Sequence, residues 1–292
     1  MSDTLASLRR KIDGAAKLES VVRTMKALAA SSIGQYETAV RALADYEHSV
    51  DLGLSVCFRQ AGSAGAETSE GKRAKIIGAI VFGSDQGLVG QFNETMAEFT
   101  VKSLAALPGE KKIWAVGERI QARLEDEGLP CAGGFAVPGS VAAITSLISQ
   151  LQVASEMPGL SAELYVFHAK PTGGPLYEPV SQRLLPLDAQ WRKDVVKTRW
   201  PRKNLPEILG QGEIVMRAFI REYLFISLYK ACAESLASEN ANRLAAMQRA
   251  EKNIDSVLTT LNRTFYRLRQ SSIDEELSDV LAGFNALSRK AT

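Results

Sequence analysis

The sequence predicts a long antiparallel coiled coil made by its two ends, with a Rossmann-like α/β domain inserted between them. No proline or glycine occurs from Glu213 to Ala282, and apolar residues recur there at helical spacing. Between the ends, short apolar runs alternate with glycine-rich turns and amphipathic stretches, which is typical of a mainly parallel sheet. The predicted parts are a coiled-coil helix over 1–58, a linker over 59–74, the α/β domain over 75–206 and a second coiled-coil helix over 207–292.

The C-terminal helix has the strongest periodicity. Its apolar positions step by four and three residues through Ile254, Leu258, Leu261, Phe265 and Leu268. After a shift in phase, the same stepping continues through Ile273, Leu277, Val280, Phe284 and Leu287. An uninterrupted helix over this segment would be on the order of 110 Å long. Because that length exceeds a small domain, the apolar stripe requires a partner helix or an enclosing protein.

The N-terminal segment, from about Thr4 to Phe58, shows an apolar repeat close to 3.5 residues, which suits a seam with another long helix. Each glycine inside this helix costs about 1 kcal/mol relative to alanine, but small residues also let two backbones approach closely. The glycines are Gly14, Gly34 and Gly53. Antiparallel pairing of the two long helices is the simplest way to cover both stripes.

The α/β domain is expected to open with a strand at Lys75–Phe82, which is apolar on both faces and therefore covered by helices on both sides. The further strands are predicted at 112–116, 131–137, 164–168 and 179–186. Helices are predicted at 93–106, 119–127 and 140–155. Prolines bracket the last strand, which predicts an edge position.

Composition excludes several classes of protein. A net charge of +2 gives no strong field for nucleic acid. The sequence has no apolar run of membrane-spanning length, and its start lacks the pattern of a secretion signal. The widely spaced Cys57, Cys131 and Cys232 are interpreted as small buried residues in a reducing compartment. A cytoplasmic, bacterial-type protein is the simplest interpretation.

Residues that carry catalytic or binding chemistry are scarce. The glycine-rich turn Gly83–Asn93 matches neither a P-loop nor G-x-G-x-x-G, so a structural role is favoured, with Ser84 or Asp85 as a cap. His48 is expected to be solvated, and His168 to be a satisfied residue at a strand end. The sequence therefore predicts no catalytic residue, no metal site and no cofactor in this chain.

Three motifs, in this order on the predicted fold, make the chain resemble the γ subunits of F-type ATP synthases over nearly its whole length. The first is LRRKI at 8–12 followed by RTMKALAAS at 23–31. The second is the turn GSDQGLVGQFN at 83–93. The third lies in the C-terminal helix, as LASENANRLAAM at 236–247 and RLRQSSIDEEL at 267–277.

The resemblance implies a rotor whose coiled coil enters a ring of alternating α and β subunits. It also implies contacts with the ε subunit and the membrane c-ring, at the cytoplasmic face of a bacterial inner membrane. The residues that the resemblance assigns to the α/β ring are Arg9, Arg10, Arg23, Met25, Lys26, Arg267, Arg269, Gln270 and Asp274. Those assigned to ε and the membrane ring are Phe219, Tyr223, Phe225 and Tyr229, although each ring has packing on the domain's own sheet as an equal alternative.

The chain departs from the family pattern at three single positions and over Gly14 to Ser20 of the N-terminal helix. Gln86 and Val89 stand where the family usually has Arg and Cys, and Asp274 stands where it usually has Thr. These departures favour a divergent branch, such as the alternative Na⁺-translocating ATPases. The ion itself is chosen by the membrane ring and not by this chain.

Two other functions fit parts of the sequence. One is a nucleotide-binding α/β enzyme with a coiled-coil dimerisation arm, which equilibrium binding of ATP or NAD would reveal. The missing P-loop lysine counts against it. The other is a non-rotary coiled-coil scaffold, which the presence or absence of α, β and ε ATPase subunits as partners would distinguish from a rotor.

Overall fold

A computed structural model describes residues 4–61, 76–155, 162–173, 176–198, 200–202, 204, 206–208 and 210–288. The predicted linker lies mostly outside these residues, as do the side chains of Phe284 and Leu287. The described chain divides into unit 1, with residues 1–28 and 245–292, and unit 2, with residues 29–244. Each unit is considered separately below.

One long helix precedes the strands of the sheet in the chain and another follows them, as predicted. They are α1 (Leu5–Ala61) and α6 (Gly212–Ser288). The strands are β1 (Ile76–Phe82), β2 (Glu110–Val116), β3 (Cys131–Phe135), β4 (Ala162–Gly173) and β5 (Leu176–Leu185). The shorter helices are α2 (Phe92–Ala105), α3 (Glu118–Asp126), α4 (Val141–Ala154) and α5 (Ala189–Lys197). These elements confirm the predicted fold class, while α5 was not predicted and β4 is longer than expected.

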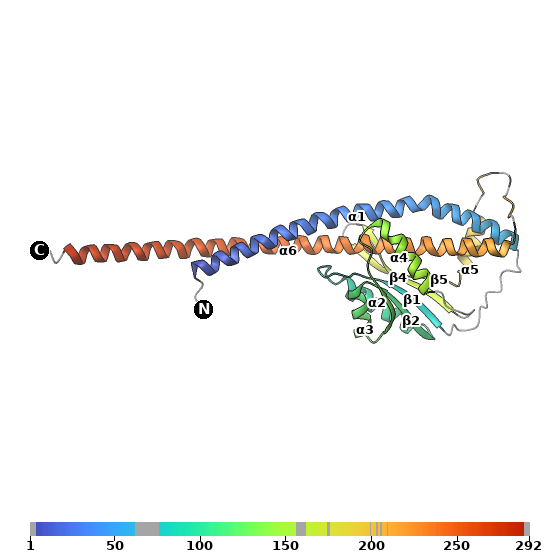
Figure 1. Ribbon diagram of the computed structural model, residues 1–292, viewed down its shortest axis with the longest axis horizontal. Coiled ribbons are helices and arrows are strands. Elements are labelled where there is room, and N and C mark those ends of the chain that lie inside the picture. Colours follow the sequence, from blue (N-terminus) through green and yellow to red (C-terminus); the bar gives the residue numbers. More distant parts are fainter. Residues whose placement is uncertain are drawn as a thin grey trace. The chain divides into compact units, whose positions relative to one another are not determined.

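The sheet of unit 2 has the strand order β3-β2-β1-β4-β5. Strands β3, β2, β1 and β4 are parallel, and β5 joins β4 in the antiparallel direction. The predictions of a mainly parallel sheet and of an edge position for the last strand are therefore confirmed. In Figure 1 the long α6 helix passes beside this sheet within unit 2.

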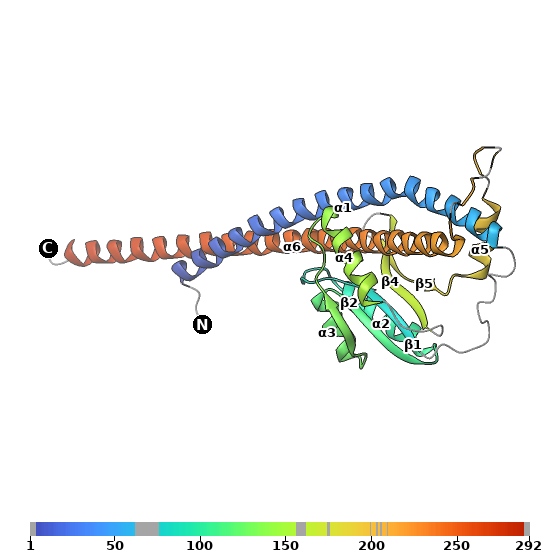
Figure 2. The ribbon, with the colours of Figure 1, turned by 45° about the vertical axis from the view of Figure 1, so that its right-hand side comes forward.

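Both faces of the sheet are buried, because alternate residues of each strand point to opposite sides. One face packs against α4, α6 and Tyr36 of α1. The other face packs against α2 and α3, which lie together on that side in Figures 1 and 2. Burial of all but the first residue of β1 agrees with a strand that is covered on both sides.

The helices α1 and α6 also pair within unit 2. Gly53 of α1 lies so close to α6 that a Cβ there would stand 2.3 Å from the ring of Phe219. Gly14 and Gly34 have no atom within 4 Å of such a Cβ, so only Gly53 shows the close approach expected of a small seam residue. Lys230 Nζ lies 3.1 Å from Glu47, which adds a polar contact across the same pair of helices.

Candidate functional site

Unit 1 pairs the start of α1 with the second half of α6. Lys26 Nζ lies 2.5 Å from Glu251 Oε2, and Arg23 Nε lies 4.0 Å from Glu251 Oε1. The hydrogen bond from Lys26 lowers the pKa of the Glu251 carboxyl. Leu8 precedes Lys26 by as many residues as residue 269 follows Glu251. In an antiparallel pair of helices, Leu8 therefore lies opposite about residue 269 of α6. Because α1 begins at Leu5, α6 has no described helix beside it much beyond that point.

Burial of the apolar stripe of α6 follows this geometry. Its first five positions, from Ile254 to Leu268, are half-buried, and Leu8 of α1 is only 1% exposed. The next positions are open to solvent, with Ile273 53% exposed and Leu277 58% exposed. The first set of apolar residues thus lies along the seam with α1, whereas the second set is uncovered in the described chain.

An aspartate in this seam is expected to destabilise unit 1. In Leu261→Asp, an unpaired carboxylate would replace a half-buried side chain and cost about 2–4 kcal/mol. Thermal melting followed by circular dichroism measures the effect. Val257→Asp on the same helix is the control, because Val257 is 51% exposed and its replacement should leave the melting curve nearly unchanged. Equal melting curves for the two variants would mean that Leu261 is not a seam residue.

The residues predicted to face a surrounding ring lie in unit 1 and are mostly exposed. Arg9, Arg10 and Arg23 are exposed on α1, whereas Met25 and Lys26 are half-buried. On α6, the exposed residues are Arg267, Arg269, Gln270 and Asp274. Within the described residues Asp274 makes no ion pair, so it is not turned towards a cation of its own shaft. Sequence reasoning missed Glu251, which already pairs with Lys26.

The glycine-rich turn is tied to the rest of unit 2 by its polar side chains. Asp85 accepts hydrogen bonds from the backbone N–H of Glu118 at 3.0 Å and from that of Val137 at 2.9 Å. Ser84 and Asn93 exchange hydrogen bonds of 3.0 and 2.8 Å. These contacts connect the turn to the starts of α2 and α3 and to the segment after β3. The turn is built as a structural junction, in agreement with its expected role.

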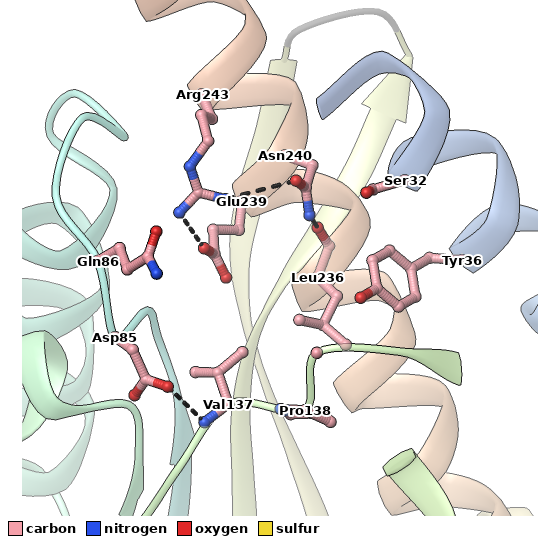
Figure 3. Close-up of a pocket in the computed structure, with 11 residues that line it drawn as sticks. Ser32, Tyr36, Asp85, Gln86, Val137, Pro138, Leu236, Glu239, Asn240 and Arg243 are labelled. Carbon is pink, nitrogen blue, oxygen red and sulfur yellow. Dashed lines mark hydrogen bonds and ion pairs between the residues drawn. The ribbon is translucent and has the colours of Figure 1, made fainter. Parts of the chain in front are cut away.

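A pocket lies beside this turn, between it, α1 and α6 (Figure 3). Glu239 and Arg243 of α6 pair through Oε1 and Nη2 at 2.6 Å, and both side chains are largely buried. Glu239 Oε2 and Arg243 Nε are buried without a hydrogen-bond partner in the described structure. Burial raises the pKa of the Glu239 carboxyl, an effect that Arg243 opposes. The four-residue spacing of Glu239 and Arg243 in the sequence was the available signal for this pair.

The aromatic residues predicted to face ε and the membrane ring are engaged inside unit 2. Phe219 packs against Gly53, and the rings of Tyr223 and Trp191 lie 4.5 Å apart. Phe225 and Tyr229 are 6.1 Å apart, and Tyr229 is only 9% exposed. A role of these residues in partner binding stays a prediction, with little of Tyr229 left accessible for it.

His168 differs from its expected place. It lies inside β4 and not at a strand end, it is 5% exposed, and its Nε2 is 2.9 Å from Glu234 Oε2. The longer β4 explains the difference, since α6 covers this part of the strand. His48 is exposed as expected. Among the described residues there is no cluster of three or more His, Cys, Asp or Glu that could hold a metal ion, and no helix long and apolar enough to cross a membrane.

Comparison with known proteins gives full-length relatives. A γ chain of ATP synthase from Parafrankia sp. is 28% identical, and the match covers 100% of both chains. The corresponding chain from Dechloromonas aromatica is 25% identical over 96% of this chain and 98% of its own.

Solved structures share the fold. The rotor of the Euglena gracilis mitochondrial ATP synthase matches with a TM-score of 0.62 and 13% identity, covering 92% of this chain and 98% of its own. The central stalk of the Tetrahymena thermophila mitochondrial enzyme matches with a TM-score of 0.57 and 19% identity, covering 79% of this chain and 99% of its own. The sequence model of the ATP synthase family matches residues 4–287. The chain therefore belongs to the ATP synthase family, together with these γ chains.

Proposed function

We propose that this chain is the γ subunit of an F-type ATP synthase, the central-stalk rotor. The observation that carries this proposal is the uncovered end of α6. From about Ile273 onward it projects an apolar stripe beyond the start of α1, next to the exposed Arg269 and Gln270, and the family match extends through it. A helix of this length with exposed apolar residues requires an enclosing partner.

The rotor mechanism follows from a difference in symmetry. A ring of alternating α and β subunits is pseudo-symmetric, whereas a shaft of two unequal helices is not. One face of the shaft therefore favours a given conformation at one catalytic site at a time. A partner shifts such an equilibrium only by its differential affinity for the two states, so rotation of the shaft converts ion flow into sequential opening and closing of the sites.

The contact with the catalytic ring is assigned to the exposed residues near the end of the seam. We infer that Arg269 and Gln270 hydrogen-bond a loop of one β subunit, with Arg9 and Arg10 on α1 facing acidic surface. The exposed Asp274 would repel an acidic loop. The matching β loop of this complex is therefore expected to carry a basic or neutral residue opposite Asp274.

The remaining assignments concern the complex as a whole. The chain would be a non-catalytic subunit without a cofactor, peripheral to the membrane at the cytoplasmic face of a bacterial inner membrane. Its further partners would be ε and the c-ring, through unit 2 and the start of α6. The polar contacts within the glycine-rich turn support a scaffold role and not a nucleotide site.

Co-purification tests this function. The tagged full-length chain, expressed in its own cells and isolated under mild conditions, should bring down α, β and ε subunits in fixed proportion. Leu261→Asp, with its disrupted seam, should bring down less of the ring than Val257→Asp. Recovery of the wild-type chain alone or as a self-assembled filament would contradict the rotor function and favour a non-rotary scaffold.

A further inference from the structure

We propose that the pocket beside the glycine-rich turn receives an arginine or lysine side chain from a neighbouring subunit, which binds Glu239. This inference rests on the proposed function for the existence of a neighbouring subunit, but not for the chemistry of the pocket. All the residues that form the pocket belong to unit 2.

The first argument is an unpaired oxygen. The Glu239 side chain is only 5% exposed, and its single hydrogen bond uses Oε1. Oε2 has no partner in the described structure. Figure 3 shows the carboxylate of Glu239 directed into the space between Gln86 and Tyr36. A buried carboxylate oxygen without a donor is costly, so a donor from outside the chain would be bound favourably.

The second argument is charge. The charged residues that line the pocket are Asp85, Glu239 and Arg243, so two acids face one base. Asp85 receives only uncharged backbone donors, and Arg243 is already engaged with Glu239. With Glu239 ionised, the formal charge of the lining is negative, which favours a cation. Burial opposes that ionised form by raising the pKa of Glu239, so a bound cation would stabilise the ionised form in place of water. A bound anion would face two carboxylates, although Arg243 Nε offers it one free donor.

The third argument is shape. The cavity volume is about 210 Å³, which is room for several non-hydrogen atoms. Leu236, Val137 and Pro138 provide apolar surface beside the acceptor groups. Arginine and lysine combine an apolar stem with a charged, donor-rich end, so this pairing of surfaces matches their side chains. The amides of Asn240 and Gln86 and the hydroxyl of Tyr36 lie around the same space as further possible acceptors (Figure 3).

A small probe tests the chemistry in the isolated full-length chain. Methylguanidinium chloride should raise the melting temperature in a saturable way relative to tetramethylammonium chloride at equal ionic strength, because only the former donates hydrogen bonds. In Glu239→Gln the apparent affinity for the probe should fall about tenfold or more, since a charge-assisted hydrogen bond becomes a neutral one. Glu98→Gln, an exposed acid on α2, is the matched control and should bind like the wild type.

A second variant keeps this test decisive if Glu239→Gln does not fold. Ser32→Lys places an ammonium group at the rim of the same pocket from α1, and it should raise the melting temperature and abolish the response to the probe. The proposal would be overturned if methylguanidinium and tetramethylammonium changed the melting temperature equally in the wild type, in Glu98→Gln and in Ser32→Lys. The pocket would then be filled by water only.

Photo-crosslinking in the assembled complex tests the source of the cation. A benzoylphenylalanine at Gln86 should crosslink to one neighbouring subunit, through a peptide that contains an arginine or lysine. Probe binding without any such crosslink would refute a partner side chain and point to a free small cation. Failure of the wild-type chain to assemble with any ring would count against the proposed function and not against the pocket.

Discussion

Replacing both Arg269 and Gln270 by alanine is expected to reduce ATP hydrolysis by the reconstituted complex about tenfold or more, with normal assembly. Both residues are exposed near the end of the seam, where α1 stops covering α6. A charge-assisted hydrogen bond from Arg contributes roughly 1.5–3 kcal/mol when partly desolvated, and each 1.4 kcal/mol corresponds to a factor of ten. Because the proposed contact would form with one β subunit at a time, its loss should affect turnover more than assembly.

The control for this experiment is Arg263→Ala, which removes an exposed cation from the same helix without touching an assigned residue. Its hydrolysis rate should stay close to that of the wild type. Steady-state hydrolysis and the subunit ratio on a gel are the two measurements. Full activity in the double variant, with a normal subunit ratio, would mean that torque passes through other parts of the shaft.

Gly117→Ala is expected to destabilise unit 2 by about 3 kcal/mol or more. Gly117 has φ +119, a conformation that residues with a side chain rarely adopt. A Cβ there would also stand 2.7 Å from the backbone oxygen of Ser84, which is held by Arg119 N–H at 3.0 Å. The alanine therefore adds an overpacking cost to a strained backbone.

Gly128→Ala separates the cost of backbone strain from the cost of overpacking. Gly128 also has a positive φ, of +81, but a Cβ there meets no atom within 4 Å. Its replacement should cost only about 1 kcal/mol, from backbone strain alone. Urea unfolding followed by tryptophan fluorescence suits the comparison, since Trp114 is buried on β2 near Gly117. Similar unfolding midpoints for the two variants would contradict the clash at Ser84.

The local sequence pattern predicted those helices and strands in which buried residues recur at a regular spacing along the chain. The helical spacing of α6 and the continuous apolar run of β1 both report which faces are covered. The short helix α5 gave no such signal. Its Trp191 packs against Tyr223 and Phe58, and Arg59 of α1 donates to the carbonyl oxygens of Val196 and Thr198 at its end. Contacts between segments that are far apart in the sequence leave little trace in a local pattern.

The pocket was hidden for a related reason. The run from Ser235 to Asn240 is polar at most positions and resembles a solvated helix face, yet Ser235, Ser238 and Glu239 are almost fully buried. The α/β domain packs over this part of α6, and Ser238 Oγ donates to the carbonyl oxygen of Ala169 at 3.1 Å. Burial here is set by tertiary packing, which composition and periodicity do not record. The residues of unit 1 that are predicted to face a ring were proposed from the resemblance and not from a local pattern.

The end of the seam near residue 269 also has a mechanical consequence. Two helices held side by side by the Lys26–Glu251 pair and by half-buried apolar residues resist bending and twisting more than a single helix does. From about Ile273 onward, α6 is a single helix in the described part of unit 1. Under a turning force applied along unit 1, deformation therefore concentrates in this last segment. The paired segment behaves as a stiff bar, and the single segment as a compliant tip that lags behind it in angle.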